Sequence, residues 1–70
     1  KMNNLNWVRT DYGFYTVDDD TLMFACEEND IFEDNICEVS DMTGLTSQEY
    51  NEVSEILLNT FNYELNGQFL

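Results

Sequence analysis

Apolar and polar residues alternate over the first third of the chain, as they do in half-buried β-strands. The alternation over 5–10 predicts a first strand, and 11–13 predicts a tight turn. The aromatic and β-branched residues of 14–17 predict a second strand. The acidic run 18–20 suits a second turn, and 21–27 predicts a third strand. The pattern therefore predicts an antiparallel meander.

The middle of the chain is compatible with two structures. Ile31, Phe32, Ile36 and Val39 can share one face of a short helix over 30–39, with Asp30 as its cap. The segment 36–40 can instead form a fourth strand, because residue spacing does not separate a short helix from a strand here. We favour the helix, followed by a loop over 41–45.

The clearest predicted element is an amphipathic helix over 46–66. Thr46 and Glu49 match a capping box, in which each side chain accepts a hydrogen bond from the other residue's backbone amide. At 100° per residue, five apolar side chains fall in one arc of about 120°, and Gly67 is placed to end the helix. The five apolar residues are Tyr50, Val53, Leu57, Phe61 and Leu65.

These elements predict a small α+β domain spanning 1–70. An antiparallel sheet of three or four strands would carry one long C-terminal helix across it, because a single apolar stripe normally faces a core. Lys1 precedes Met2, and we interpret Lys1 as a remnant of expression before a natural initiator methionine. With 43% hydrophobic residues, the chain has enough apolar side chains for a core.

Charge narrows the possible functions. The 70 residues carry fifteen carboxylates and two cationic side chains, for a formal net charge of −13. Proteins that bind nucleic acids or anionic membranes need clusters of Lys and Arg, so we expect neither to be a direct ligand. We find no signal peptide and no membrane-spanning stretch in the sequence, and we expect a cytoplasmic protein.

Side chains for catalysis are scarce, and we expect no enzymatic activity and no cofactor. The chain has no histidine, so a nucleophilic Ser or Cys would have no imidazole base. Its three glycines are too far apart for a phosphate-binding loop. A thin core rarely forms the deep cleft in which a carboxylate pair works. The spacing of Cys26 and Cys37 fits no redox or zinc motif, and we interpret both as buried free thiols.

Two acidic clusters raise the question of a divalent cation. The run 18–20, and the group Glu27, Glu28 and Asp30, offer the oxygen ligands that Ca²⁺ and Mg²⁺ prefer. Neither cluster has the spacing of an EF-hand loop. We interpret the run as a solvated turn and expect no dedicated metal site, while a protein that responds to divalent cations through this run remains an alternative function.

The distribution of charge is more informative than its total. Ten carboxylates and no cation lie within 18–41, and three more glutamates follow at intervals of three in the predicted helix. Solubility needs a net charge of only about 2–8 in a small domain. We therefore predict that these side chains bind a partner: Asp18, Asp19, Asp20, Glu27, Glu28, Asp30, Glu33, Asp34, Glu38, Asp41, Glu49, Glu52 and Glu55.

Three explanations of this charge compete. A compact body with rows of carboxylates can imitate DNA, which carries about one charge per 1.7 Å of duplex. Alternatively, the charge is an adaptation to high salt, although the many asparagines and aromatic residues fit that poorly. As a third possibility, the chain is an acidic accessory or structural subunit whose charge keeps it in solution.

In size, acidity and lack of catalytic side chains, the whole chain resembles the small acidic inhibitors that bacteriophages and mobile elements encode. These include anti-restriction proteins, anti-CRISPR proteins and inhibitors of uracil-DNA glycosylase. The resemblance rests on no motif and transfers no residue role. It implies a non-enzymatic DNA mimic that binds a basic surface of a host nucleic-acid-processing enzyme and blocks DNA or RNA binding.

The ten aromatic residues bear on how a partner is contacted. One helix cannot cover both faces of a sheet, so we expect exposed rings among Trp7, Tyr12, Tyr15, Tyr63 and Phe69. Exposed rings beside carboxylates can stack on arginines of a partner. An uncovered sheet face can also associate with a second copy, so a homodimer is an alternative.

Overall fold

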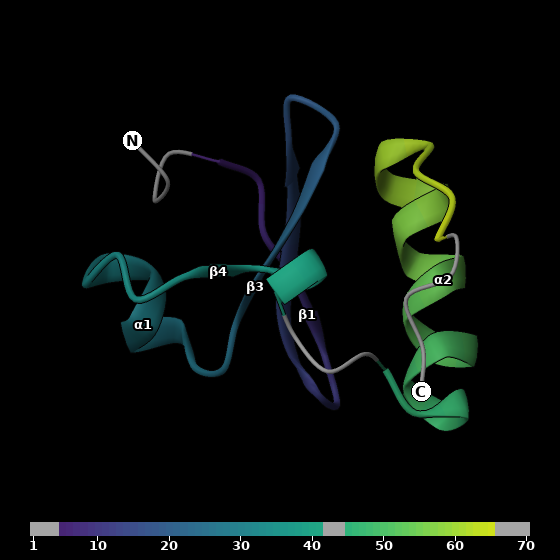
Figure 1. Cartoon of the computed structure of the whole chain (residues 1–70), viewed down its shortest axis with the longest axis horizontal. Coiled ribbons are helices and arrows are strands. Elements are labelled where there is room, and N and C mark those ends of the chain that lie inside the picture. Colours follow the sequence, from purple (N-terminus) through teal and green to yellow (C-terminus); the bar gives the residue numbers. More distant parts are fainter. Residues whose placement is uncertain (1–4, 42–44, 66–70) are drawn as a thin grey trace.

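The computed structural model describes residues 5–41 and 45–65, which form an antiparallel sheet with a helix against each face (Figure 1). This confirms the predicted α+β class, although the C-terminal helix is fifteen residues long and shorter than predicted. The elements in chain order are β1 (Val8–Thr10), β2 (Gly13–Asp18), β3 (Thr21–Ala25), α1 (Glu28–Phe32), β4 (Cys37–Glu38), the 3₁₀ helix η2 (Val39–Asp41) and α2 (Ser47–Phe61).

The sheet is a meander in which strands adjacent in sequence are adjacent in space, in the order β1-β2-β3-β4. Val8 pairs with Tyr15, and Tyr15 pairs with Phe24, so the predicted turns join paired strands. Between β2 and β3, Asp19 and Asp20 both have positive φ, 51° and 64°. Such a pair forms the two-residue turn whose twist matches that of a hairpin. The three predicted strands are therefore confirmed.

The segment after β3 contains both of the structures that its sequence allowed, and the favoured helix over 30–39 is wrong in extent. Helix α1 ends at Phe32, because Asp34 takes a left-handed φ of 59° and the Asn35 amide donates to the carbonyl of Asp30. The chain then returns along β3, where Cys37 pairs with Phe24. Asp30 is the third residue of the helix and not its cap.

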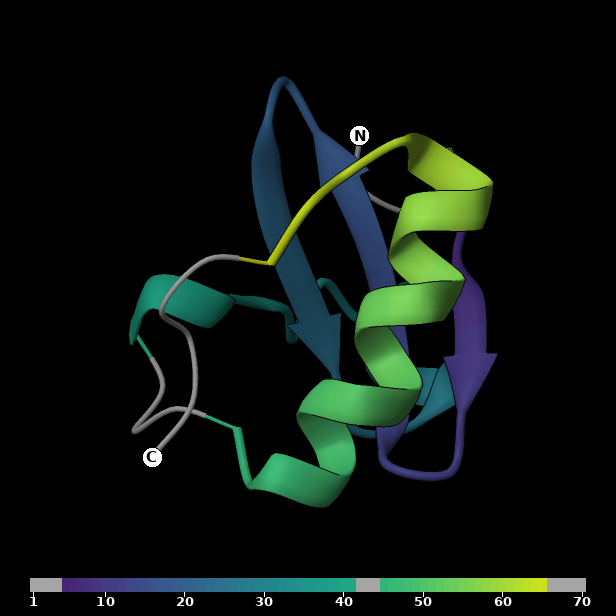
Figure 2. The same cartoon turned by 90° about the vertical axis from the view of Figure 1, so that its right-hand side faces the viewer.

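Helix α2 covers one face of the sheet and encloses the main core (Figure 2). The predicted capping box is confirmed: Glu49 N–H donates to Thr46 Oγ1 at 3.2 Å, and Thr46 N–H donates to Glu49 Oε1 at 3.1 Å. The core includes residues from the sheet, from η2, from α2 and from the segments flanking that helix. Its buried members are Tyr15, Leu22, Phe24, Val39, Leu45, Val53, Leu57 and Leu65.

The C-terminal end of α2 differs from the prediction. The helix stops at Asn62, which takes a left-handed φ of 54° and donates its amide to the carbonyl of Leu58. Asparagine is one of the few residues besides glycine that adopt this conformation readily. Leu65 therefore reaches the core from an extended segment, where its carbonyl accepts a hydrogen bond from the Tyr50 hydroxyl at 3.0 Å. The predicted cap Gly67 lies outside the described residues.

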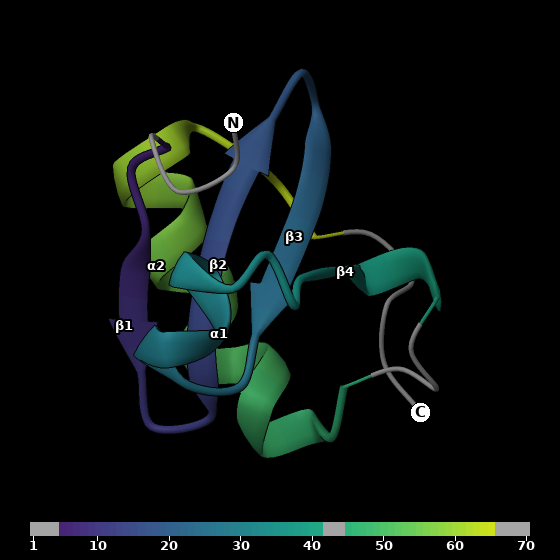
Figure 3. The same cartoon turned by 90° about the vertical axis from the view of Figure 1, so that its left-hand side faces the viewer.

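The second face of the sheet is partly covered by α1 and by the segment before β1 (Figure 3). Met23 and Ala25 point away from the main core and are buried there, as is Ile31 of α1. Thr16 is also fully buried, and its hydroxyl donates to the carbonyl of Asn6 at 2.6 Å. A small second core thus exists where the sequence predicted an uncovered face.

Three further expectations about exposure are corrected by the structure. Cys26 and Cys37 are free thiols, but both are exposed, because Cys26 lies beyond the end of β3 and Cys37 lies on a strand of only two residues. Tyr15, expected among the exposed rings, is fully buried between β1 and β3. Phe69 lies outside the described residues, and the ring that is most exposed among those described is Phe32, at 65%.

Candidate functional site

The thirteen candidate carboxylates are divided among separate parts of the fold. The hairpin group, Asp18, Asp19 and Asp20, lies at the turn between β2 and β3. The α1 group, defined as Glu27, Glu28, Asp30, Glu33 and Asp34, lies on α1 and at its two ends. The α2 group is Glu49, Glu52 and Glu55. Glu38 lies on β4 and Asp41 on η2.

The hairpin group is remote from the α1 group. Strand β3 has five residues and separates the two by about 17 Å at roughly 3.4 Å per residue. Asp19 and Asp20 are exposed, and both occupy the turn because their backbones tolerate positive φ. Within the described residues, no three His, Cys, Asp or Glu side chains are grouped so as to hold a metal ion.

The α1 group combines carboxylates that hold the start of α1 with others that only face solvent, since Glu27 is the N-cap of the helix and forms a capping box with Asp30. Asp30 Oδ2 accepts a hydrogen bond from the Glu27 amide at 3.1 Å, and Asp30 Oδ1 accepts from Asn35 Nδ2 at 3.3 Å. These two bonds hold the start of the helix and the loop after it in a defined geometry. The side chains of Glu27, Glu28 and Glu33 are exposed to solvent around this helix.

The α2 group serves mainly to hold the fold together. Glu49 completes the capping box with Thr46. Glu52 is half-buried, and its Oε2 accepts a hydrogen bond from the Asp11 amide at 3.2 Å, which fastens the β1–β2 turn to the helix. Glu55 alone in this group is exposed. The regular spacing of three in the sequence therefore does not produce a row of equally available charges.

The remaining two candidates lie between these groups. Glu38 is exposed, and its Oε2 accepts a hydrogen bond from Ser40 Oγ at 3.4 Å. The short stretch 38–41 crosses from the second face of the sheet toward α2 (Figures 1 and 3). The segment 38–41 therefore belongs to neither the α1 group nor the α2 group.

The α1 and α2 groups lie on opposite faces of the sheet (Figures 1 and 3). The structure exposes 4621 Å² of surface, and a protein partner typically covers about 800 Å² on each side. Such a partner would cover roughly a sixth of this molecule. A single interface of ordinary size therefore engages one of the two groups and leaves the other in solvent.

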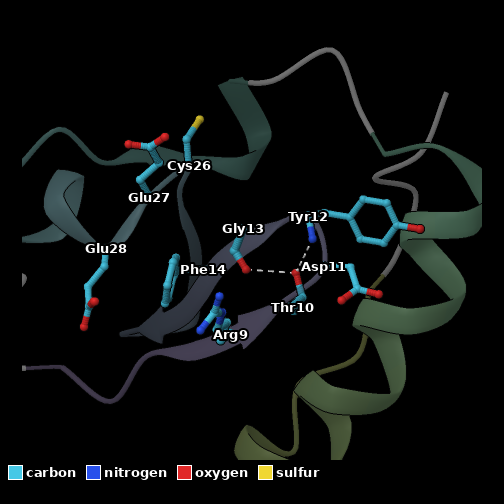
Figure 4. Close-up of a pocket in the computed structure, with 9 residues that line it drawn as sticks. All are labelled: Arg9, Thr10, Asp11, Tyr12, Gly13, Phe14, Cys26, Glu27 and Glu28. Atoms are coloured by element: carbon cyan, nitrogen blue, oxygen red, sulfur yellow. Dashed lines mark hydrogen bonds between the residues drawn. The ribbon is translucent and has the colours of Figure 1, made fainter.

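A groove that the sequence analysis did not identify runs beside the α1 group, between that helix and the β1–β2 hairpin. Arg9 and Phe14 form a cross-strand pair and lie side by side, with Glu27 and Glu28 to one side (Figure 4). Thr10 shapes the β1–β2 turn, which lies at one end of this groove. Its hydroxyl donates to the Gly13 carbonyl at 2.9 Å and accepts from the Tyr12 amide at 3.0 Å. The alternation of side chains along β1 places Trp7 on the same face as Arg9. This alternation was the signal in the sequence from which the groove could have been predicted.

Titration departs clearly from ordinary behaviour at Tyr15. Burial raises the pKa of this phenol to about 12, with smaller contributions from the negative charges of Glu49 and Cys37. Because the ring lies inside the core, this shift belongs to the fold and not to a surface that meets a partner.

No helix in the described residues is both long and apolar enough to cross a membrane. The chain matches no protein-family model, and comparison with curated proteins and with solved structures finds no similar protein.

Proposed function

We propose that this chain is a non-enzymatic inhibitor that binds the basic nucleic-acid-binding surface of a nucleic-acid-processing enzyme and blocks access of DNA or RNA. The enzyme would be of the kind that phage-encoded acidic inhibitors target, such as a CRISPR effector, a restriction enzyme or a DNA glycosylase. The inhibitor would act in the cytoplasm of the host cell. The observation that carries the proposal is the density of solvent-facing negative charge on a compact scaffold.

That density is close to the density of a nucleic acid. The molecule is 29 Å along its longest axis and carries a formal net charge of −13. A DNA duplex of the same length carries about 17 phosphate charges at one per 1.7 Å. A body of this charge is attracted over long range to the grooves that hold DNA, which accelerates association.

The placement of the cations supports the same proposal. All fifteen carboxylates lie in the described residues, together with a single cationic side chain, Arg9. Around α1 the exposed carboxylates have no cation within their own segment to neutralise them. Lysines and arginines that normally contact phosphate would supply the missing partners, at the cost of little rearrangement in the inhibitor.

A competition assay tests the proposal. Fluorescein-labelled DNA is bound to a purified CRISPR effector, a restriction enzyme and a uracil-DNA glycosylase, and the anisotropy of the label is followed as the chain is added. We expect release of DNA from at least one enzyme, with the apparent affinity of the inhibitor falling steeply between about 50 and 200 mM salt. Failure to displace DNA from any of them at the lower salt concentration contradicts the proposal.

A neutralised variant and a matched control locate the effect of charge. The variant E28Q/E33Q removes two exposed carboxylates and keeps Glu27 and Asp30, which form the capping box of α1. The control E55Q/E64Q removes two exposed carboxylates from α2 and the segment after it. We propose that the enzyme contacts the α1 side of the sheet, so we expect the first variant to weaken competition at least tenfold and the second to weaken it less than threefold.

A further inference from the structure

The second face of the sheet carries an apolar groove, here called the α1 groove. It is a cavity of about 230 Å³ lined by apolar side chains from three segments, with Arg9 and Glu28 at its border. A second hollow of about 400 Å³ shares Arg9, Phe14 and Glu28 with it and continues toward the β1–β2 turn. The apolar lining consists of Leu5, Trp7, Phe14, Ile31 and Phe32.

The exposure of Phe32 marks this groove as unusual. The ring is 65% exposed, whereas its neighbour Ile31 is 6% exposed and fills the small second core. A large ring left in water beside other half-buried apolar side chains is typical of a surface that meets a partner. Nothing in the described part of the chain covers this ring.

The charge around the α1 groove decides between possible occupants. Two exposed carboxylates of the α1 group lie beside it: Glu28 lines the α1 groove, and Glu27 lines the hollow that continues from it. A second copy would bring another molecule of net charge −13 against these carboxylates, and the two would repel. A segment rich in arginine or lysine brings the complementary charge.

We propose that the α1 groove is the docking site for a basic segment of the target protein that carries one large apolar anchor. This inference rests on the proposed function and specifies which of the two acidic faces meets the target. The anchor enters between Trp7, Phe14 and Phe32, and the flanking cations pair with Glu27 and Glu28. Arg9, which lines both the groove and the adjoining hollow, directs the cations of the partner toward the carboxylates of Glu27 and Glu28 (Figure 4).

The chemistry of the groove suits such a segment. The face of an aromatic ring can hold a guanidinium or pack against an apolar side chain, so Phe32 can contact either. The carboxylates Glu27 and Glu28 can each accept the paired hydrogen bonds of an arginine. Charge alone would attract many basic proteins, whereas the anchor selects a segment with an apolar residue at the right place.

Two peptides and two protein variants test the inference. The probe is a short fluorescein-labelled peptide of alternating arginine and serine with one central tryptophan, and its control replaces that tryptophan by alanine. The variant Phe32→Ala removes the exposed ring of the groove. The variant Leu58→Ala is the matched control, because Leu58 is 45% exposed on the opposite face. Both changes are at exposed positions, so both variants are expected to fold, which circular dichroism checks.

We expect the tryptophan peptide to bind the wild-type chain at least tenfold more tightly than its alanine control. Phe32→Ala should remove most of that difference, and Leu58→Ala should leave it unchanged. Equal binding of the two peptides, no binding, or a loss caused by Leu58→Ala and not by Phe32→Ala overturns the inference. Self-association of the wild-type chain that Phe32→Ala abolishes also overturns it, in favour of a second copy.

The peptide result is separable from the test of the proposed function. If E28Q/E33Q weakens the displacement of DNA and Phe32→Ala does not, the proposed inhibitor function stands and docking at the α1 groove is wrong. If the peptide binds through Phe32 but the chain displaces DNA from none of the enzymes, docking at the α1 groove stands and the proposed inhibitor function is wrong.

Discussion

Tyr15 carries the most direct test of the core. Its side chain is fully buried, and within the described residues its hydroxyl has no hydrogen-bond partner. The ring itself is well placed, with its centroid 5.0 Å from that of Phe24. The substitution Tyr15→Phe deletes only the hydroxyl oxygen and keeps the contact between the rings.

The expected effect at neutral pH is a gain in stability. A buried hydroxyl without a partner costs about 1–3 kcal/mol in lost hydration, and deletion of one oxygen leaves a void that takes back part of that gain. We expect Tyr15→Phe to raise the free energy of unfolding by about 1 kcal/mol. In a domain of 60–100 residues this corresponds to a rise in Tm of roughly 4–8 °C.

The same substitution should change the response to alkaline pH. The pKa of Tyr15 is raised from its ordinary 10.0 to about 12, mainly by burial. Between these values the unfolded chain releases the phenolic proton and the folded chain keeps it, so this titration leaves the free energy of unfolding unchanged below pH 10 and lowers it as pH rises toward 12. The loss amounts to roughly 2–3 kcal/mol at 1.36 kcal/mol per pKa unit, and the phenylalanine variant is spared it.

Urea unfolding followed by circular dichroism, at neutral pH and at several values between pH 10 and 12, measures both effects. The gap in unfolding free energy between variant and wild type should be about 1 kcal/mol at neutral pH and should widen as pH rises. A variant less stable than the wild type by 1 kcal/mol or more at neutral pH would mean that the hydroxyl has a partner. A gap that stays constant with pH would refute the raised pKa.

Three further substitutions test the turns and the cap, each by thermal or urea unfolding against the wild type. Asp20→Gly should stabilise by about 0.5–1 kcal/mol, since glycine takes the positive φ of 64° without strain; a loss of stability would contradict the assigned turn. Thr46→Ala should cost about 1 kcal/mol through loss of the bond to the Glu49 amide, with Ser47→Ala as the neutral control. Gly13→Ala should destabilise by more than 1 kcal/mol, because Gly13 has a φ of +140° and an added Cβ would lie 2.5 Å from the Phe24 ring; unchanged stability would contradict that close approach.

The parts of the fold that were predictable are those set by neighbouring residues. Alternation along 5–27 gave three strands in the right order, and the pair of Thr46 and Glu49 gave the start of α2. The end of α2 also had a local signal, since Asn62 adopts the left-handed conformation readily, but the cap was predicted at Gly67 and Asn62 was not considered. The extent of α1 was not predictable in this way. It depends on a left-handed aspartate at position 34 and on pairing of β4 with β3, which is a contact between distant residues.

The candidate site shows the limit of reasoning from a charge run. Ten carboxylates lie close together in sequence within 18–41, yet β3 carries the chain about 17 Å between the first three and the next five, at roughly 3.4 Å per residue. Hydrogen bonds further divide the candidate carboxylates: Glu49 and Glu52 accept from the backbone amides of Thr46 and Asp11, whereas Glu28 faces solvent beside the α1 groove. Charge in the sequence therefore specifies how much attraction the surface can exert, and the fold specifies where. A partner that docks in the α1 groove would contact the carboxylates together with the apolar side chains next to them. Phe32 is an exposed apolar side chain that lines the same groove as Glu28.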